Sequence, residues 1–398
     1  MTRKVDTTVR VLMIAPHYPY PIAGGIEKQA HELARALAAL GTPVQALGIR
    51  HAPGHARRDT VDGITVYRVM WSGSRFVRGL VASWQLTSTL FRLRRDYDVM
   101  HVHVPSGFGF IALLTARLLG KPVLTKLPNV GERGIPGLRA RTLGRLAVRI
   151  LLSSDAIVAM SQESLDELAA AGFPSERILA TSNGIALPPL VATARPATGS
   201  RRLRAVFIGR LVAQKGLRVL LNAWATLDAS LHASAELEIW GEGPEEAELR
   251  ALATRLGIAG EVHFRGQVAD VGDRLSQVDL FVLPSFVEGN SNALLEAMAA
   301  GLPAIATRTG GTPMLMGPDA ARWVVEPGDA GALASALSTL LADSALRAQA
   351  GALLRLRVEQ RFDIAAVART YRRAYALLAS GERSRMVECR DTWPQADK

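Results

Sequence analysis

Short apolar runs and longer stretches with helical spacing alternate along the chain. Residues 9–15 form an apolar run, Gly24 and Gly25 follow as a turn, and residues 26–40 carry apolar side chains at helical spacing. Further strand-like runs lie at residues 44–49, 64–69, 99–104, 122–127 and 157–160. Helical stretches between several of them are residues 108–119 and 164–171. This alternation predicts a mostly parallel sheet covered by helices on both faces.

The pattern is then interrupted and begins again. Residues 186–203 are rich in Pro, Ala, Thr, Gly and Arg and show no periodicity, which is typical of a linker. The second series of strand-like runs comprises residues 204–208, 237–240, 262–264, 279–283, 304–306 and 323–325. The chain is therefore predicted to fold as two tandem doubly wound α/β domains. Ligands bind beyond the carboxyl ends of such strands, so two facing domains would form a cleft.

A length of 398 residues suits two domains rather than one core. The expected division is a first domain at 1–188, a linker at 189–203, a second domain at 204–361, an amphipathic helix at 362–380 and a disordered tail at 381–398.

The net charge of +11 is confined to the first half of the chain. Residues 1–199 hold 24 basic and 13 acidic side chains, whereas residues 200–398 hold 23 of each. A basic half could face nucleic acid, an anionic membrane or a phosphorylated substrate, or could reflect heavy arginine use alone. Helix-turn-helix spacing, zinc-finger cysteines and basic runs with stacking aromatics are missing from the sequence, so nucleic acid is the weakest candidate.

The sequence also bears on the compartment. Its single cysteine, Cys389, cannot form an intramolecular disulfide, which favours a reducing compartment. The apolar stretch near the N-terminus is short and lacks a small-residue cleavage site, and Arg117 interrupts the longest apolar run. We expect a cytoplasmic protein that at most touches the inner face of the plasma membrane.

Three motifs indicate chemistry. Gly24-Gly25 before a helix suits an anion, although a tight turn without a ligand fits equally well. Arg210 and Lys215 lie in a Gly-Arg…Lys-Gly loop after a strand, where two cations suit a diphosphate better than they suit solvent alone. In residues 284–298 a strand leads to Glu288 and a Gly-Asn-Ser loop, and the helix that follows carries a second carboxylate, Glu296. The loop amides and the helix N-terminus between them suit a phosphate or a sugar hydroxyl.

Together these motifs resemble the retaining glycosyltransferases of family 4, which have the GT-B fold. The residues that carry the resemblance are Gly24-Gly25, Asn183-Gly184, Gly209-Arg210…Lys215-Gly216, Gly241-Glu242-Gly243-Pro244, Glu288…Glu296 and Ala299–Pro303. The resemblance covers about residues 9–379. It implies two Rossmann-like domains facing across a cleft, with a C-terminal helix that returns to the first domain.

The resemblance also implies roles for single residues. Arg210 and Lys215 would bind the diphosphate of the donor, Glu296 its ribose, and Gly25 would let the first domain approach the diphosphate. Glu288 would lie beside the transferred sugar, and His103 would contact that sugar. The backbone amides near the sugar would be those of Gly289, Asn290 and Ser291. Catalytic roles are thus expected for Glu288, His103, Lys215 and Arg210.

The chain departs from the family pattern at two loops, and a third motif points elsewhere. Gly289-Asn290-Ser291 replaces the frequent Gly-Phe-Gly, and Met314 stands where many relatives carry a glutamate. Asp96-Tyr97-Asp98 matches the metal signature of another glycosyltransferase fold, but its position before a buried strand favours a turn. We expect no metal and no cofactor, because cations and helix dipoles can meet the diphosphate charge.

The predicted function is therefore a retaining, metal-independent transfer of sugar from a UDP- or GDP-linked donor to a hydroxyl acceptor. The basic first half favours a lipid-linked glycan acceptor in exopolysaccharide or lipopolysaccharide synthesis and contact with an anionic membrane surface. A solvated helix face is the alternative for that charge. The alternative activities are a nucleotide-sugar 2-epimerase of the same fold and a nucleotide-sugar-binding protein without turnover. The sugar, the base and the acceptor stay open.

Overall fold

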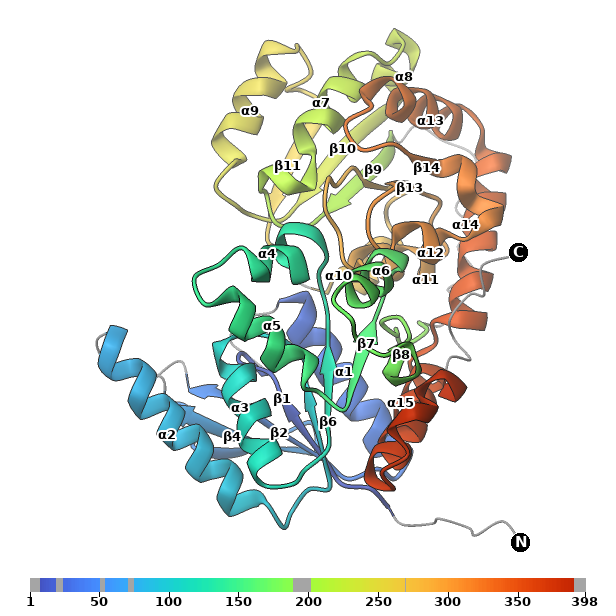
Figure 1. Ribbon diagram of the computed structural model, residues 1–398. Coiled ribbons are helices and arrows are strands. Elements are labelled where there is room, and N and C mark those ends of the chain that lie inside the picture. Colours follow the sequence, from blue (N-terminus) through green and yellow to red (C-terminus); the bar gives the residue numbers. More distant parts are fainter. Residues whose placement is uncertain are drawn as a thin grey trace, which may run out of the picture. The chain divides into compact units, whose positions relative to one another are not determined.

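The computed structural model of the chain describes residues 8–18, 24–50, 54–70, 75–188, 202–268 and 270–389. The chain divides into two compact units (Figure 1). The first unit comprises residues 1–186 together with 364–398, and the second comprises residues 187–363. Each unit is built on a parallel sheet, as the alternating pattern predicts. Most of the expected linker, residues 189–201, lies outside the described residues.

The first unit is organised around a sheet with the strand order β3-β4-β2-β1-β5-β6-β7-β8. Its strands are β1 (Val11–Ile14), β2 (Val44–Arg50), β3 (Arg58–Val61), β4 (Ile64–Met70), β5 (Val99–Val102), β6 (Val123–Lys126), β7 (Ala156–Ala159) and β8 (Ile178–Ala180). All neighbouring strands pair in parallel except β3, which pairs antiparallel with β4 at the edge. Strands β3 and β8 were not predicted from the sequence.

Helices cover both faces of this sheet. They are α1 (Gly25–Ala39), α2 (Arg75–Leu93), α3 (Gly107–Leu118), α4 (Ile135–Arg139), α5 (Gly144–Leu152), α6 (Gln162–Ala170) and α15 (Ile364–Ala379), with 3-10 turns η1 (Gly131–Arg133), η2 (Ser175–Arg177) and η5 (Arg383–Cys389). Val11 and Met13 share a core with α1 and α15, whereas Leu12 and Ile14 share one with α2 and α3. This period-2 alternation explains why each strand reads as a continuous apolar run.

The C-terminal helix returns to the first unit, as expected. Helix α15 packs beside α1 and buries Val367, Tyr371 and Tyr375 in the core of that unit. The expectation of a disordered tail from residue 381 onward was wrong for residues 383–389. These form η5 and bury Met386 and Cys389 in the same core, because two apolar side chains supply enough buried surface to order a short turn. Residues 390–398 lie outside the described residues.

The Asp96-Tyr97-Asp98 motif is a turn at the amino end of β5, as predicted. Asp98 accepts hydrogen bonds from the backbone N of Arg10 at 2.9 Å and from its Nη2 at 2.7 Å. The guanidinium of Arg10 holds the pKa of Asp98 below its usual value. Asp98 therefore joins the start of β5 to the start of β1.

The second unit has the strand order β11-β10-β9-β12-β13-β14, and its strands pair in parallel. The strands are β9 (Leu203–Ile208), β10 (Ala235–Trp240), β11 (Val262–Gly266), β12 (Leu280–Leu283), β13 (Ala304–Thr307) and β14 (Val324–Val325). The helices are α7 (Leu217–Ala225), α8 (Ala229–Ser234), α9 (Glu246–Arg255), α10 (Val271–Leu275), α11 (Asn292–Ala299), α12 (Thr312–Met316), α13 (Ala330–Ala342) and α14 (Ser344–Arg361), with 3-10 turns η3 (Ala213–Lys215) and η4 (Pro318–Trp323). None of the helices within the described ranges is long and apolar enough to cross a membrane.

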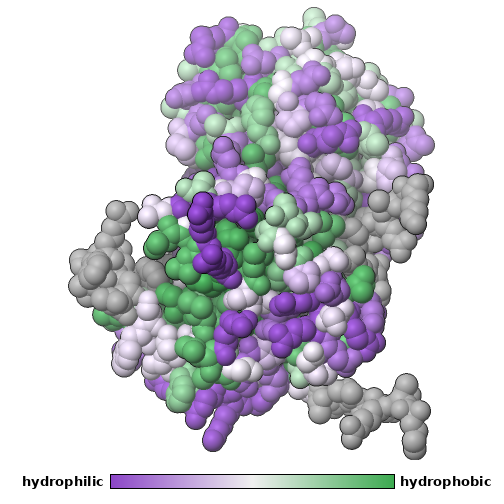
Figure 2. All heavy atoms as spheres, in the orientation of Figure 1, coloured by the Kyte–Doolittle hydropathy of each residue, from purple (hydrophilic) through white to green (hydrophobic). Residues whose placement is uncertain are grey.

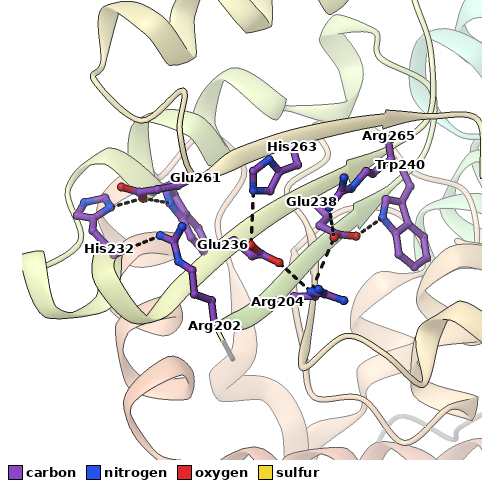
Figure 3. Close-up of polar contacts among 10 residues, drawn as sticks. Arg202, Arg204, His232, Glu236, Glu238, Trp240, Glu261, His263 and Arg265 are labelled. Carbon is purple, nitrogen blue, oxygen red and sulfur yellow. Dashed lines mark hydrogen bonds and ion pairs between the residues drawn. The ribbon is translucent and has the colours of Figure 1, made fainter. Parts of the chain in front are cut away.

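One face of β9, β10 and β11 carries a row of paired charges (Figure 3). Arg204 of β9 contacts Glu236 of β10 at 2.7 Å, and Arg265 of β11 contacts Glu238 of β10 at 2.9 Å. Trp240 Nε1 also donates to Glu238, whose pKa lies below its usual value because these bonds favour the carboxylate over the cost of its burial. The charges on this face are therefore satisfied across adjacent strands.

Candidate active site

The functional loops of the second unit lie where its strand order reverses. Strand β9 pairs with β10 on one side and with β12 on the other: the chain runs outward from β9 through β10 to β11 and then returns to the opposite side of β9 as β12. The loop after β9 holds residues 209–216, and the loop after β12 holds residues 284–291. Because ligands of doubly wound sheets bind at this switch point, the topology brings both motif loops to the expected position.

Gly216 ties these two loops together. Its φ of +67° lies in the left-handed region, and a Cβ there would stand 1.9 Å from the carbonyl oxygen of Pro284. The backbone N of Phe286 donates to the carbonyl oxygen of Gln214 at 2.8 Å, which adds a direct bond between the loops. Only glycine meets both demands, so the Lys-Gly pair of the motif has a structural cause.

Lys215 and Glu288 meet across this joint. Lys215 Nζ lies 2.5 Å from Glu288 Oε1, and the hydroxyl of Ser285 donates to the same oxygen at 2.7 Å. The Glu288 side chain is 9% exposed and that of Lys215 is 24% exposed, so water reaches the lysine more readily than the carboxylate. Glu288 therefore holds the partly exposed ammonium group of Lys215 in place between the two loops.

The loop after β13, which contains Gly310 and Gly311, packs against the backbone of Glu288 and Gly289. Gly310 has a φ of +49°, and a Cβ there would stand 1.9 Å from the carbonyl oxygen of Glu288. The backbone N of Gly311 donates to the carbonyl oxygen of Gly289 at 2.6 Å. The Gly-Gly-Thr-Pro segment thus holds the backbone around Glu288, even though Met314 follows it in place of a glutamate.

Helix α11 begins directly after the Gly-Asn-Ser loop. Ser291 caps it, since its hydroxyl accepts from the backbone N of Leu294 at 3.3 Å. Glu296 lies in the second turn and is half-buried, while Arg210 on the β9 loop is exposed. The positive end of the helix dipole therefore adjoins Gly289, Asn290 and Ser291, which suits an anion or a sugar hydroxyl.

The first unit has its own switch point, between β1 and β5. Gly25 is the first residue of α1, which follows β1. His103 directly follows β5, and its backbone N donates to the carbonyl oxygen of Ile14 at 3.0 Å. The predicted first-domain residues therefore follow the two strands that flank this reversal; residues 19–23, before Gly24, lie outside the described residues.

His103 is buried beside a buried lysine. Its side chain is fully buried, and Lys126 at the end of β6 donates to Asn183 Oδ1 at 2.6 Å. Burial lowers the pKa of Lys126 to about 8. Burial and, to a lesser degree, the Lys126 charge hold the pKa of His103 well below its usual value, so the imidazole is neutral.

Two polar residues of these sites, Ser285 and Lys126, were not predicted from the sequence. Ser285 carried only a weak signal, the Ser-x-x-Glu spacing to Glu288, which is also common at helix starts. Lys126 did carry a signal, because it is one of only six lysines and ends an otherwise apolar strand. In the parts of the chain that the structure describes, no three His, Cys, Asp or Glu side chains group as metal ligands.

Comparison with known families agrees with both halves of this arrangement. Residues 24–184 match the family model described as glycosyl transferase 4-like domain, and residues 202–343 match the one described as glycosyl transferases group 1. The two matches together include every predicted site residue.

Individual relatives are distant. The chain is 31% identical over 196 residues to the lipopolysaccharide core biosynthesis glycosyltransferase LpsE of Rhizobium meliloti, which is 49% of this chain and 56% of the relative. It is 26% identical over 404 residues to a glycogen synthase of Mycobacterium tuberculosis, covering 94% of this chain and 96% of that protein. The crystal structure of Anabaena HepE with UDP and glucose superposes with a TM-score of 0.75 at 19% identity, covering 92% of this chain and 99% of that one.

Proposed function

Because the chain belongs to the group 1 glycosyl transferases, we propose that it transfers a sugar from a nucleotide diphosphate donor to a hydroxyl acceptor with retention of configuration. The observation that carries this proposal is the Lys215–Glu288 contact at the switch point of the second sheet. It combines a cation for a diphosphate with a carboxylate for a sugar in the place where such sheets bind ligands.

The residues of the second unit then take distinct roles. Lys215 and the exposed Arg210 neutralise the charge that grows on the departing diphosphate. The backbone N–H groups of Gly289, Asn290 and Ser291 donate to sugar hydroxyls and phosphate oxygens. Glu296 accepts hydrogen bonds from the ribose. Glu288 lies beside the sugar and, with Ser285, holds Lys215 in position.

In the proposed step, the bond between the anomeric carbon and the diphosphate oxygen breaks as the acceptor oxygen bonds to the same carbon. The acceptor approaches from the face that the diphosphate leaves, so the configuration is kept. The acceptor proton passes to the departing phosphate oxygen, which balances the step without a protein nucleophile. We assign the contact with the donor sugar to His103 and close approach to the diphosphate to Gly25, as the family resemblance implies.

Metal independence is part of the proposal. The positive charge of Arg210, Lys215 and the α11 dipole supports it, since these groups supply the compensation that a divalent ion would otherwise provide. Turnover should therefore persist after treatment with EDTA. Loss of turnover that a divalent ion restores would overturn this part of the proposal alone.

The acceptor is proposed to be a lipid-linked glycan, reached at an anionic membrane. Helices α2, α3 and α5 of the first unit leave large apolar side chains exposed, and Figure 2 shows apolar side chains gathered on this side of the unit. The exposed side chains on these helices are Val81, Trp84, Phe91, Leu114, Leu118 and Leu146, and Leu143 is exposed directly before α5. Arg145 and Arg149 are exposed on the same helix as Leu146. Apolar side chains beside arginines suit an anionic leaflet, which for this chain is the cytoplasmic one.

A panel of nucleotide sugars tests the activity. Thermal stabilisation identifies the donor, because a ligand that binds the folded state raises its apparent stability. The expected result is transfer to a glycan or glycolipid acceptor with an unchanged anomeric configuration by NMR. Conversion of the donor sugar in the absence of acceptor would indicate the epimerase instead. Stabilisation without any product would indicate a binding protein.

A further inference from the structure

The imidazole of His103 lies against a second buried histidine. His101 is two residues earlier and points to the same face of β5, and the two ring centroids are 4.0 Å apart with an interplanar angle of 29°. The His101 ring also stacks with Tyr371 of α15, at a centroid distance of 5.3 Å. Both histidines are fully buried.

Tyr375, one turn further along α15, fixes the His101 ring. Its hydroxyl lies 2.7 Å from His101 Nδ1. Burial raises the pKa of Tyr375 well above its usual value, so the phenol keeps its proton. Burial also holds the pKa of His101 well below its usual value. A neutral imidazole nitrogen is the better acceptor, so we assign the proton to Tyr375, which leaves His101 protonated on Nε2.

His103 lacks a comparable anchor of its own. Among the described residues, neither ring nitrogen of His103 has a hydrogen-bond partner. A buried ring that can turn about two side-chain torsions is then oriented by the surfaces packed against it. The stacked His101 ring is one such surface, and His101 is itself held by the bond to Tyr375.

We propose that Tyr375 and His101 are positioning residues, through which helix α15 sets the orientation of the His103 imidazole toward the donor sugar. The proposal rests on the role of His103 proposed above. It also gives the return of the C-terminal helix a purpose beyond stability: residues 274 positions apart in sequence jointly orient one side chain of the site.

Tyr371 supplies a matched control for the hydroxyl of Tyr375. Both tyrosines are fully buried on the same face of α15, and both rings lie near His101. Among the described residues, however, the hydroxyl of Tyr371 has no hydrogen-bond partner. Tyr371→Phe and Tyr375→Phe therefore remove the same atom from similar surroundings, and only the second breaks a bond.

The first readout is steady-state kinetics of the full chain. We expect Tyr375→Phe to lower kcat about tenfold while the KM for the donor stays within about twofold, since misorientation costs more in the transition state than in binding. Tyr371→Phe should change neither constant by more than about twofold. Equal kcat values in the two variants would overturn the proposal.

The second readout is NMR of the protein labelled with 15N-histidine. The wild type should show His101 protonated on Nε2, and Tyr375→Phe should shift the ring resonances of both His101 and His103. Tyr371→Phe should leave them in place. If Tyr375→Phe shifts the His101 resonances and leaves those of His103 unchanged, the proposal is overturned, because the orientation of His103 would not depend on Tyr375.

A double variant separates positioning from stability. His101→Phe combined with Tyr375→Phe replaces both members of the polar pair by apolar rings, which restores folding if Tyr375→Phe alone is unstable. Positioning predicts that kcat stays low although the melting temperature recovers, and full recovery of kcat would overturn it. If the wild type turns over no nucleotide sugar, the proposed function fails, and the His103 resonances still decide whether α15 orients that ring.

Discussion

The two units of the molecule use charge in opposite ways. The second unit, residues 187–363, holds 17 basic and 19 acidic side chains and satisfies many of them internally. Lys215 pairs with Glu288 at the candidate site, and Arg204 and Arg265 pair with glutamates across the sheet (Figure 3). In the candidate site, the ion pair with Glu288 fixes the position of Lys215, the cation that we expect to bind an anionic ligand.

The first unit carries the surplus of cations on its surface. Arg145 and Arg149 of α5 are exposed, and neither has an acidic partner within the described ranges. In its interior, burial holds the pKa values of His101 and His103 well below their usual value, so both rings are neutral, and burial lowers the pKa of Lys126 to about 8. Unpaired surface charge of this kind is available to a partner outside the molecule, whereas the paired charges of the second unit are committed within it.

Two lysines show the contrast at single residues. Lys215 lies at the rim of its loop and meets a carboxylate, whereas Lys126 is 5% exposed and meets the neutral amide of Asn183. Burial disfavours the charged form of Lys126 and lowers its pKa to about 8. Lys215 is exposed enough to bind an anion, whereas Lys126 can gain or lose its proton near pH 8.

The largest predicted effect comes from removing the cation of the second unit. Lys215→Ala should lower kcat about 100- to 1000-fold, because it removes charge stabilisation from the departing diphosphate. The change also leaves Glu288 without its cation. The measurement is donor turnover, with Lys121→Ala at the amino edge of the first sheet as a control that should retain activity. Wild-type turnover in Lys215→Ala would refute the assignment of this site.

A smaller effect is expected from the surface of the first unit. Replacing Arg145 and Arg149 by Gln should weaken binding to vesicles of anionic lipid about 30-fold, at about 1 kcal/mol for each arginine near the surface. Vesicle flotation at low and high salt measures this. The control replaces Arg250 and Arg255 of α9 by Gln and should bind as the wild type does. Equal loss in both variants, or no binding by the wild type at low salt, would exclude the proposed membrane face.

The smallest effect concerns the buried lysine. Between pH 8 and 10 the folded chain has lost the Lys126 proton that the unfolded chain still holds, since the pKa is about 8 in the fold and 10.5 without it. The free energy of unfolding should therefore rise with pH across this window, by about 1–2 kcal/mol relative to Lys126→Met. Urea unfolding at several pH values measures the difference. Parallel pH profiles for the two proteins would show that folding does not lower the pKa of Lys126.

Most of the architecture could be predicted from the sequence. The apolar runs located strands such as β1, β5 and β9 to within one or two residues, because buried parallel strands lack polar positions. The edge strand β3 escaped notice, since its Arg58-Asp59-Thr60-Val61 sequence is mostly exposed and carries no apolar run. The turn η5 was also missed. Its segment is mostly polar, and its two buried residues, Met386 and Cys389, contact a core formed by residues distant in the sequence.

The sequence by itself determined the element pattern, the confinement of the net charge to one half and the motif loops with Lys215 and Glu288. Only the tertiary structure decided which side chains meet: Lys215 with Glu288 and Ser285, Lys126 with Asn183, and Tyr375 with His101. Periodicity reports the environment along one element, where neighbours are fixed by the chain. Contacts between elements depend on strand order and on the return of α15, which local patterns do not encode.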